Sequence, residues 1–91
     1  MQITFQVSLY PIAKNDFKTP INNFIAGLRK SGIGVTVHET STIGSGDAEK
    51  VFEAIKNAYV TASMQGDTVM VLTVVNGAPT GEELKELNRN Q

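Results

Sequence analysis

The side chains of this sequence that could bind a ligand are concentrated in residues 38–47, which read HETSTIGSGD. The segment holds the only histidine of the chain, two carboxylates, four hydroxyls and a single aliphatic residue, Ile43. Hydroxyls and an imidazole both donate and accept hydrogen bonds, and carboxylates accept them or attract cations. Such residues line small-molecule sites, although the same composition also suits an ordinary loop.

The sequence offers no recognisable set of catalytic residues around this segment. The chain has no cysteine, which excludes thiolate nucleophiles and disulfides. One histidine does not make a multi-histidine metal site, and no nucleophile is visibly paired with it, so we expect neither a metal nor a catalytic residue. Residues 44–47, GSGD, lack the lysine of a phosphate-binding loop, and Asp47 would repel phosphate. We expect a turn and a helix N-cap there.

Length and charge restrict the class of protein. The chain has 91 residues, is 41% hydrophobic and carries a net charge of −1, which fits one small domain over residues 1–91. Its charge provides no field for nucleic acid or anionic membranes. No run of about 18 apolar residues and no signal-like N-terminus is present. We therefore expect a cytoplasmic, soluble protein without nucleic-acid or membrane partners.

Apolar spacing predicts two amphipathic helices. The first begins at Thr19 as N-cap with Pro20 after it and ends at Gly32, and the second begins at residues 46–47 and ends at Gly66. We expect Gly27 to let the first helix approach a strand. The apolar stripes, all expected in the core, are Ile21, Phe24, Ile25, Leu28, Ala48, Val51, Phe52, Ile55, Ala58, Tyr59 and Ala62.

Alternation of apolar and polar residues predicts four strands, over residues 2–10, 33–37, about 41–44, and 68–75. With the helices between them the order is βαββαβ. Right-handed crossovers then give an α+β, ferredoxin-like sandwich, in which a four-stranded antiparallel sheet carries both helices on one face. The charged residues near 81–88 predict a short C-terminal helix.

The other face of this sheet would be uncovered. In the first strand it would present Thr4, Gln6, Ser8 and Tyr10, and in the second Thr36, His38 and Thr40. The last strand is apolar on both faces, so it would add either Val69, Val71, Thr73 and Val75 or Met70, Leu72 and Val74. Because exposed apolar strips are usually covered, we expect a second copy of the chain to pair with this face and to form a ligand pocket there.

Two stretches, VSLYPI at 7–12 and HETSTIGSGDAEKVFEAI at 38–55, resemble the thiamine-binding, YkoF-like family. The resemblance continues through TVMVLTVVNGAP at 68–79. It implies ferredoxin-like domains that pair through their sheets and bind thiamine or its hydroxymethylpyrimidine part without catalysis. This chain carries one copy of the domain, so the pairing would join chains into a homodimer or a tetramer.

The resemblance and the chemistry of the ligand together define the candidate ligand contacts. Hydroxyls and amides suit an aminopyrimidine, which both donates and accepts hydrogen bonds. A carboxylate and an aromatic face suit a thiazolium cation. The candidates are Gln6, Ser8, Tyr10, His38, Glu39, Thr40, Ser41, Thr42 and Asp47. No cofactor is expected apart from the bound ligand itself.

We therefore expect a binding protein for salvage, transport or buffering of thiamine or its pyrimidine part. An oligomeric regulatory domain that senses another small metabolite fits the fold and the uncovered face equally well. An enzyme of the acylphosphatase kind is disfavoured because residues 11–20, PIAKNDFKTP, contain lysines but no arginine. RNA binding is disfavoured because the sheet lacks stacked aromatics and basic charge.

Overall fold

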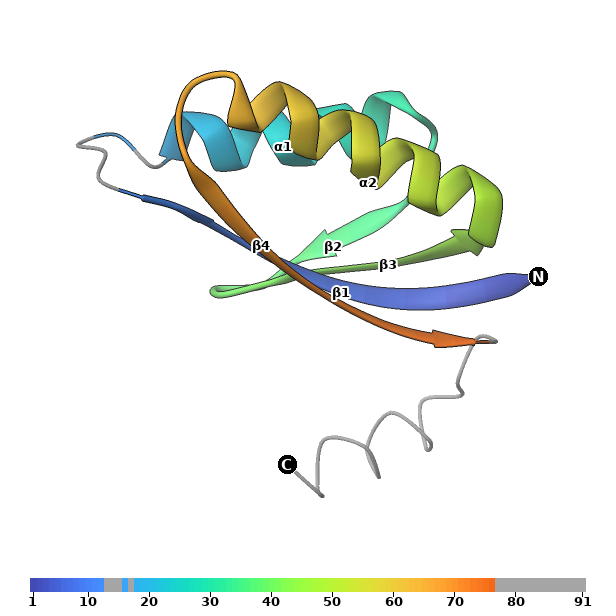
Figure 1. Cartoon of the computed structure of the whole chain (residues 1–91). Coiled ribbons are helices and arrows are strands. Elements are labelled where there is room, and N and C mark those ends of the chain that lie inside the picture. Colours follow the sequence, from blue (N-terminus) through green and yellow to red (C-terminus); the bar gives the residue numbers. More distant parts are fainter. Residues whose placement is uncertain (13–15, 17, 77–91) are drawn as a thin grey trace.

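Strand β1 is an inner strand of the sheet, and it pairs with β3 on one side and with β4 on the other. The computed structural model describes residues 1–12, 16 and 18–76. Its elements are β1 (Gln2–Pro11), α1 (Lys18–Lys30), β2 (Val35–Val37), β3 (Thr42–Asp47), α2 (Ala48–Ser63) and β4 (Thr68–Asn76). The four strands form one antiparallel sheet in the order β2-β3-β1-β4, and both helices cover the same face of it (Figure 1). The predicted ferredoxin-like α+β fold is confirmed, while the predicted helix at 81–88 lies outside the described residues.

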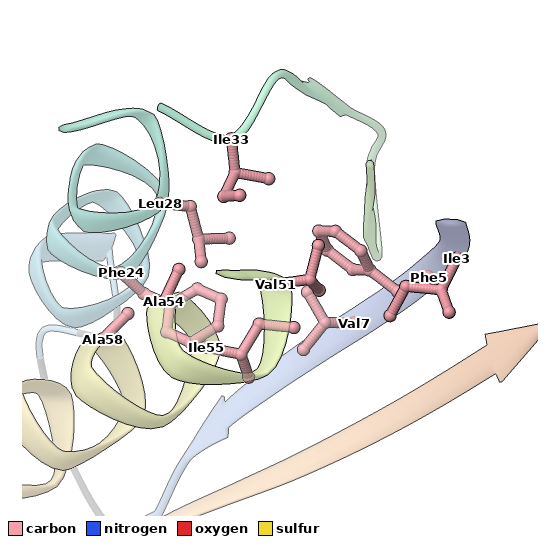
Figure 2. Close-up of a cluster of buried hydrophobic side chains, with 10 residues drawn as sticks. All are labelled: Ile3, Phe5, Val7, Phe24, Leu28, Ile33, Val51, Ala54, Ile55 and Ala58. Carbon is pink, nitrogen blue, oxygen red and sulfur yellow. The ribbon is translucent and has the colours of Figure 1, made fainter. Parts of the chain in front are cut away.

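The core lies between the sheet and the two helices. On β1 the predicted alternation holds, since Ile3, Phe5 and Val7 are buried toward the helices and Leu9 packs against them. Figure 2 shows Ile3, Phe5 and Val7 of β1 in one cluster with residues from α1, α2 and the segment before β2. The buried cluster consists of Ile3, Phe5, Val7, Phe24, Leu28, Ile33, Val51, Ala54, Ile55 and Ala58.

Strand β3 is longer than its sequence predicts. Residues 44–47 continue the strand and pair with β1, so the expectation of a turn there is wrong. Gly44 lies directly opposite Phe5, where a Cβ would come within 2.7 Å of the phenyl ring. A Cβ at Gly46 would come within 3.2 Å of Val51. Because Gly44 and Gly46 have no side chain, β3 can lie close to the core side chains of Phe5 and Val51.

The two helices pack closely through small residues. A Cβ on Gly27 of α1 would lie 3.4 Å from Ala58 of α2, so this glycine faces the other helix and not, as predicted, a strand. Ala54, which the apolar stripe did not include, is buried. Phe52 is 48% exposed, and its prediction as a core residue is wrong because only a narrow side of α2 faces α1 and the sheet. Tyr59 ties α2 to the sheet, since its hydroxyl donates to the Thr68 carbonyl oxygen at 2.8 Å.

The sequence predicts the end of α1 correctly but not the residue that caps its start. Gly32 adopts a left-handed φ of 87° and ends the helix as predicted. The start is capped by Asp16, not Thr19, because the Asp16 carboxylate accepts from the Thr19 hydroxyl at 2.6 Å and from two backbone N–H groups. The hydrogen bond from the Thr19 hydroxyl is the main cause that lowers the pKa of Asp16. After the helix, Ile33 is buried but precedes the strand, so β2 is shorter than predicted.

The register of β4 decides which of its faces is uncovered. Val71 and Val69 lie opposite Ser8 and Tyr10 of β1, so they point away from the helices. The first of the two alternatives for the last strand is therefore correct. The uncovered face, called the open face below, carries Thr4, Gln6, Ser8, Tyr10, Thr36, Ile43, Ser45, Val69, Val71, Thr73 and Val75.

We predict that Gly44→Ala destabilises the protein by about 1–3 kcal/mol, as overpacking of a core does, because the added methyl would overlap Phe5 and the Gly34 carbonyl oxygen. Gly34→Ala is the matched control, since nothing lies within 4 Å of its Cβ position. The midpoint of urea unfolding measures both. Equal stability of the two variants would contradict the proposed close approach of β3 to β1.

Candidate ligand-binding site

A pocket of about 310 Å³ opens at the end of the sheet where β1 extends beyond β3. β3 pairs with β1 only as far as Val7, whereas β4 continues along β1 to Pro11. The last residues of β1 are therefore bordered on one side by the β2–β3 loop, residues 38–41, instead of by a strand. The first turns of α1 contribute the third wall, so three separate segments enclose the pocket.

The pocket has an apolar floor and a polar rim. The floor residues point to the helix side of the sheet or come from α1, and they are Val7, Leu9, Pro11, Ile21, Phe24, Ile25 and Val37. The rim comes from the end of β1, the loop and the start of β3, and its residues are Ser8, Tyr10, His38, Glu39, Thr40, Ser41 and Thr42. A concave apolar surface with a few polar groups is the usual composition of a small-molecule site.

Two hydrogen bonds fix the loop that forms the rim. The His38 backbone N–H donates to the Ser41 carbonyl oxygen at 2.7 Å and closes the turn between β2 and β3. The Ser8 hydroxyl donates to the Thr40 carbonyl oxygen at 2.9 Å and holds the loop against β1. The side chains of His38, Thr40 and Ser41 make no hydrogen bond within residues 1–12, 16 and 18–76. They are available to a ligand because the backbone, and not the side chains, carries the loop contacts.

The structure brings most of the predicted contact residues together at this pocket. Gln6 is not among them, since it lies on the open face opposite Ile43 and Thr73. Asp47 lies at the far end of β3, opposite Gln2, where its carboxylate is 3.4 Å from the N-terminal ammonium group. The residues that do line the pocket are Ser8, Tyr10, His38, Glu39, Thr40, Ser41 and Thr42. Ligand contact at each of them stays a prediction.

Two of these residues lie elsewhere than expected, and a third is buried. His38 and Thr40 were expected on the open face of a strand, but β2 ends at Val37 and both lie in the loop. Thr42 begins β3 opposite Val7, faces the helices and is 6% exposed, which makes it the least accessible residue of the rim. The pocket is thus formed within one chain and on the helix side of the sheet. It is not formed where two open faces meet.

Sequence reasoning missed the floor of the pocket. Ile21, Phe24 and Ile25 belong to the apolar stripe of α1, and that pattern predicts core residues without distinguishing a filled core from a cavity. Val37 is 46% exposed although its strand alternation predicts burial. The pocket opens here because β2 is short. The sequence does not show this shortness, since the alternation of apolar residues already begins at Ile33 and continues through Val35.

The charge of the pocket favours neutral or cationic ligands. Glu39 is the one carboxylate of its lining, His38 is the one ionisable base, and no lysine or arginine occurs among the described lining residues. Over the same described part of the chain, no group of three or more His, Cys, Asp and Glu residues could hold a metal ion. No described helix is both long and apolar enough to cross a membrane.

Comparison with known proteins gives one family match and several structural neighbours. The model of the YKOF-related family matches residues 2–81. Protein SP2199 from Streptococcus pneumoniae superposes with a TM-score of 0.79 at 15% identity, covering 98% of this chain and 99% of that chain. TM0486 from Thermotoga maritima, provisionally described as a thiamine biosynthesis/salvage protein, gives 0.77 at 16% identity and covers 100% of both chains. A DUF77 domain from Bacillus cereus gives 0.75 at 21% identity, covering 94% of this chain and 86% of that chain.

Because these three neighbours are only 15–21% identical to the chain, they show its fold and nothing further about it. No curated protein sequence matches it significantly.

We predict that Ser8→Ala loosens the rim loop, because it removes the hydrogen bond to the Thr40 carbonyl oxygen. Amide hydrogen exchange at His38 should accelerate, while global stability falls by only about 1 kcal/mol, the usual value of one hydrogen bond. Ser45→Ala is the control, since Ser45 is an exposed serine on the open face of β3. If both variants left exchange at His38 unchanged, the Ser8 contact would have no part in holding the loop.

Proposed function

We propose that this chain, which belongs to the YKOF-related family, is a non-enzymatic binding protein for thiamine or its hydroxymethylpyrimidine part. The observation that carries the proposal is the pocket beside β1, with its apolar floor and hydroxyl-rich rim. Its volume of about 310 Å³ lies at the lower end of the range for small-molecule sites, which suits one small heterocycle. The provisional description of the structural neighbour TM0486 agrees with this ligand.

The pyrimidine ring matches the floor and the rim in chemistry. A flat aromatic ring buries its faces against apolar side chains such as Leu9 and Phe24. Its ring nitrogens accept hydrogen bonds and its amino group donates them, and the hydroxyls of Thr40 and Ser41 serve either role. In the described structure these hydroxyls have no other hydrogen-bond partner, so binding would not break existing contacts.

The thiazolium part of thiamine would lie toward the mouth of the pocket. Tyr10 is 51% exposed and has an aromatic face that could contact a cation, and Glu39 is an exposed carboxylate of the same rim. The same carboxylate would repel the phosphates of thiamine pyrophosphate. We therefore expect the protein to prefer the unphosphorylated compounds.

A binding role without catalysis fits the arrangement of the ionisable groups. General base catalysis needs an oriented base within hydrogen-bond reach of a nucleophile. His38 is exposed, and no side chain in the described structure orients its ring. The role that follows is storage, delivery or salvage of the bound compound.

We predict that thiamine and hydroxymethylpyrimidine raise the thermal unfolding temperature in a saturable way, and that thiamine pyrophosphate raises it less. Ligand at about 100 times its Kd adds about 2.7 kcal/mol of stability. Each kcal/mol moves the midpoint of a domain of this size by about 4–8 °C. Glu39→Gln should weaken thiamine more than hydroxymethylpyrimidine, because only thiamine carries the cation.

The matched control for this experiment is Glu53→Gln, which removes an exposed carboxylate from α2, a helix that contributes no described residue to the pocket lining. Glu53→Gln should leave the shift in unfolding temperature unchanged for both thiamine and hydroxymethylpyrimidine. Absence of a shift with any of the three compounds would remove thiamine from the proposal. A screen that found saturation with another metabolite would favour the regulatory alternative.

We also propose that two copies of the chain pack against one another through their open faces. Val69, Val71 and Val75 lie on that face and are 44%, 53% and 37% exposed. No described element covers them, since both helices lie on the other side (Figure 1). Stacking two such faces would remove the valines from water, which supplies stability that a domain of this size needs.

We predict that Val71→Lys separates copies that are joined through the open face and lowers the mass in solution by about half. Val60→Lys is the control, because Val60 is a valine of similar exposure, 48%, on the helix layer. Analytical ultracentrifugation measures the mass of each variant. An unchanged mass for Val71→Lys in an oligomeric protein would place the interface elsewhere.

A further inference from the structure

Thr42 is the only polar side chain among the buried residues of the described chain, and it is 6% exposed. Its neighbours across the sheet are Val7 of β1 and Val37 of β2, so apolar side chains flank it on both sides. All three residues line the pocket. A hydroxyl in such surroundings calls for a reason, because burying a polar group without a hydrogen bond is unfavourable.

The Thr42 hydroxyl has no hydrogen-bond partner within residues 1–12, 16 and 18–76. The buried residues of this part of the chain hold no polar side-chain atom that is both sealed from solvent and unpartnered. The hydroxyl oxygen therefore keeps a small accessible surface, and because Thr42 lines the pocket, this surface meets the cavity. Valine has the same shape and would fill the position without an unpaired hydroxyl, so the fold gains nothing from threonine here.

The other hydroxyls of the rim differ from Thr42 in their surroundings. Ser8 already donates to the Thr40 carbonyl oxygen. Thr40 is exposed and Ser41 is half-buried, so water bonds to their hydroxyls in the free protein. A ligand contact at these residues exchanges one hydrogen bond for another and contributes little to affinity. At Thr42 the apolar neighbours exclude most water, so a hydrogen bond gained or lost there has a larger effect.

We propose that the Thr42 hydroxyl is the innermost ligand contact of the pocket and that it donates to a ring nitrogen of the bound heterocycle. This inference rests on the proposed function and adds which atom of the ligand is recognised. The floor side chains are all apolar, so they supply no other donor to a ring nitrogen that points inward. The amino group of the pyrimidine needs an acceptor instead, and the Glu39 carboxylate and the rim hydroxyls provide acceptors.

A hydrogen bond at Thr42 determines how thiamine is oriented in the pocket. The pyrimidine enters first, because a thiazolium cation placed on the apolar floor would lose its hydration without gaining a carboxylate. The same bond defines the class of ligand. Aromatic rings that contain a hydrogen-bond acceptor are selected, whereas a benzene ring of the same size leaves the hydroxyl unpaired and is rejected.

Removal of the hydroxyl should have different effects on stability and on binding. Thr42→Val keeps the branched shape of the side chain, so we expect the urea midpoint of the free protein to equal or exceed that of the wild type. Its affinity for hydroxymethylpyrimidine should fall by about 10–100-fold, the range for a buried group that loses its hydrogen bond. Thr42→Ser keeps the hydroxyl and should retain most of the affinity.

The test measures affinity by isothermal titration calorimetry for hydroxymethylpyrimidine and for ortho-amino-para-methylbenzyl alcohol. The second compound keeps the amino, methyl and hydroxymethyl groups but has a benzene ring in place of the pyrimidine. The wild type should prefer hydroxymethylpyrimidine, and Thr42→Val should bind both compounds with similar, low affinity. Thr36→Val is the matched control, since Thr36 is an exposed threonine of β2 that does not line the pocket. It should bind both compounds as the wild type does.

The outcomes distinguish this inference from the function on which it rests. Unchanged affinity of Thr42→Val for hydroxymethylpyrimidine would overturn the hydrogen bond at Thr42 and leave the proposed binding function intact. A urea midpoint of Thr42→Val below that of the wild type would mean that the hydroxyl serves the fold, which overturns the inference as well. If the wild type bound neither hydroxymethylpyrimidine nor thiamine, the proposed function would fail, and the inference with it.

Discussion

The close packing of Phe5 over Gly44 is the contact on which the arrangement of the sheet depends. Gly44 lies opposite Phe5 on one side and opposite Val35 on the other, so it aligns β1, β3 and β2 in one register. A side chain at this position would collide with the phenyl ring, which is 1% exposed and has no room to move. Because this register is fixed, β3 begins beside Val7, and the rim loop comes to lie against the last residues of β1.

The pocket is a consequence of strands that end at different places. β1 continues to Pro11 after its pairing with β3 has stopped, and α1 crosses above the uncovered part. Leu9 and Ile21, which are only half buried, form the floor of a cavity beside the core residue Phe24. The polar rim comes from a loop whose backbone is already hydrogen-bonded, which leaves its side chains for recognition. This division of roles supports the proposed binding of a small heterocycle.

The sheet has two separate uncovered surfaces, and both converge on β4. The open face exposes Val69 and Val71, and the outer edge exposes backbone groups that no described strand pairs with. The open face offers apolar side chains to a partner, whereas the edge offers backbone hydrogen-bonding groups. The open face also carries Ser8 and Tyr10, which belong to the rim of the pocket, so an association through this face would lie next to the candidate ligand contacts.

The sequence by itself determined the order of the elements, the fold class and much of the core. Alternation at Ile3, Phe5 and Val7 and the spacing of Phe24 and Leu28 report local periodicity, which a single strand or helix imposes on its own residues. The glycine stop at Gly32 is equally local, since it needs only a left-handed backbone.

Only the tertiary structure decided how these elements meet. It extended β3 to Asp47, exposed Phe52, buried Ala54 and determined which face of β4 is uncovered, because each of these depends on the distance to a neighbour that is remote in sequence. The same holds for the candidate site. Its polar rim was recognisable as residue types, but its floor, and the separation of Gln6 and Asp47 from it, arise from the register of three strands and the position of one helix.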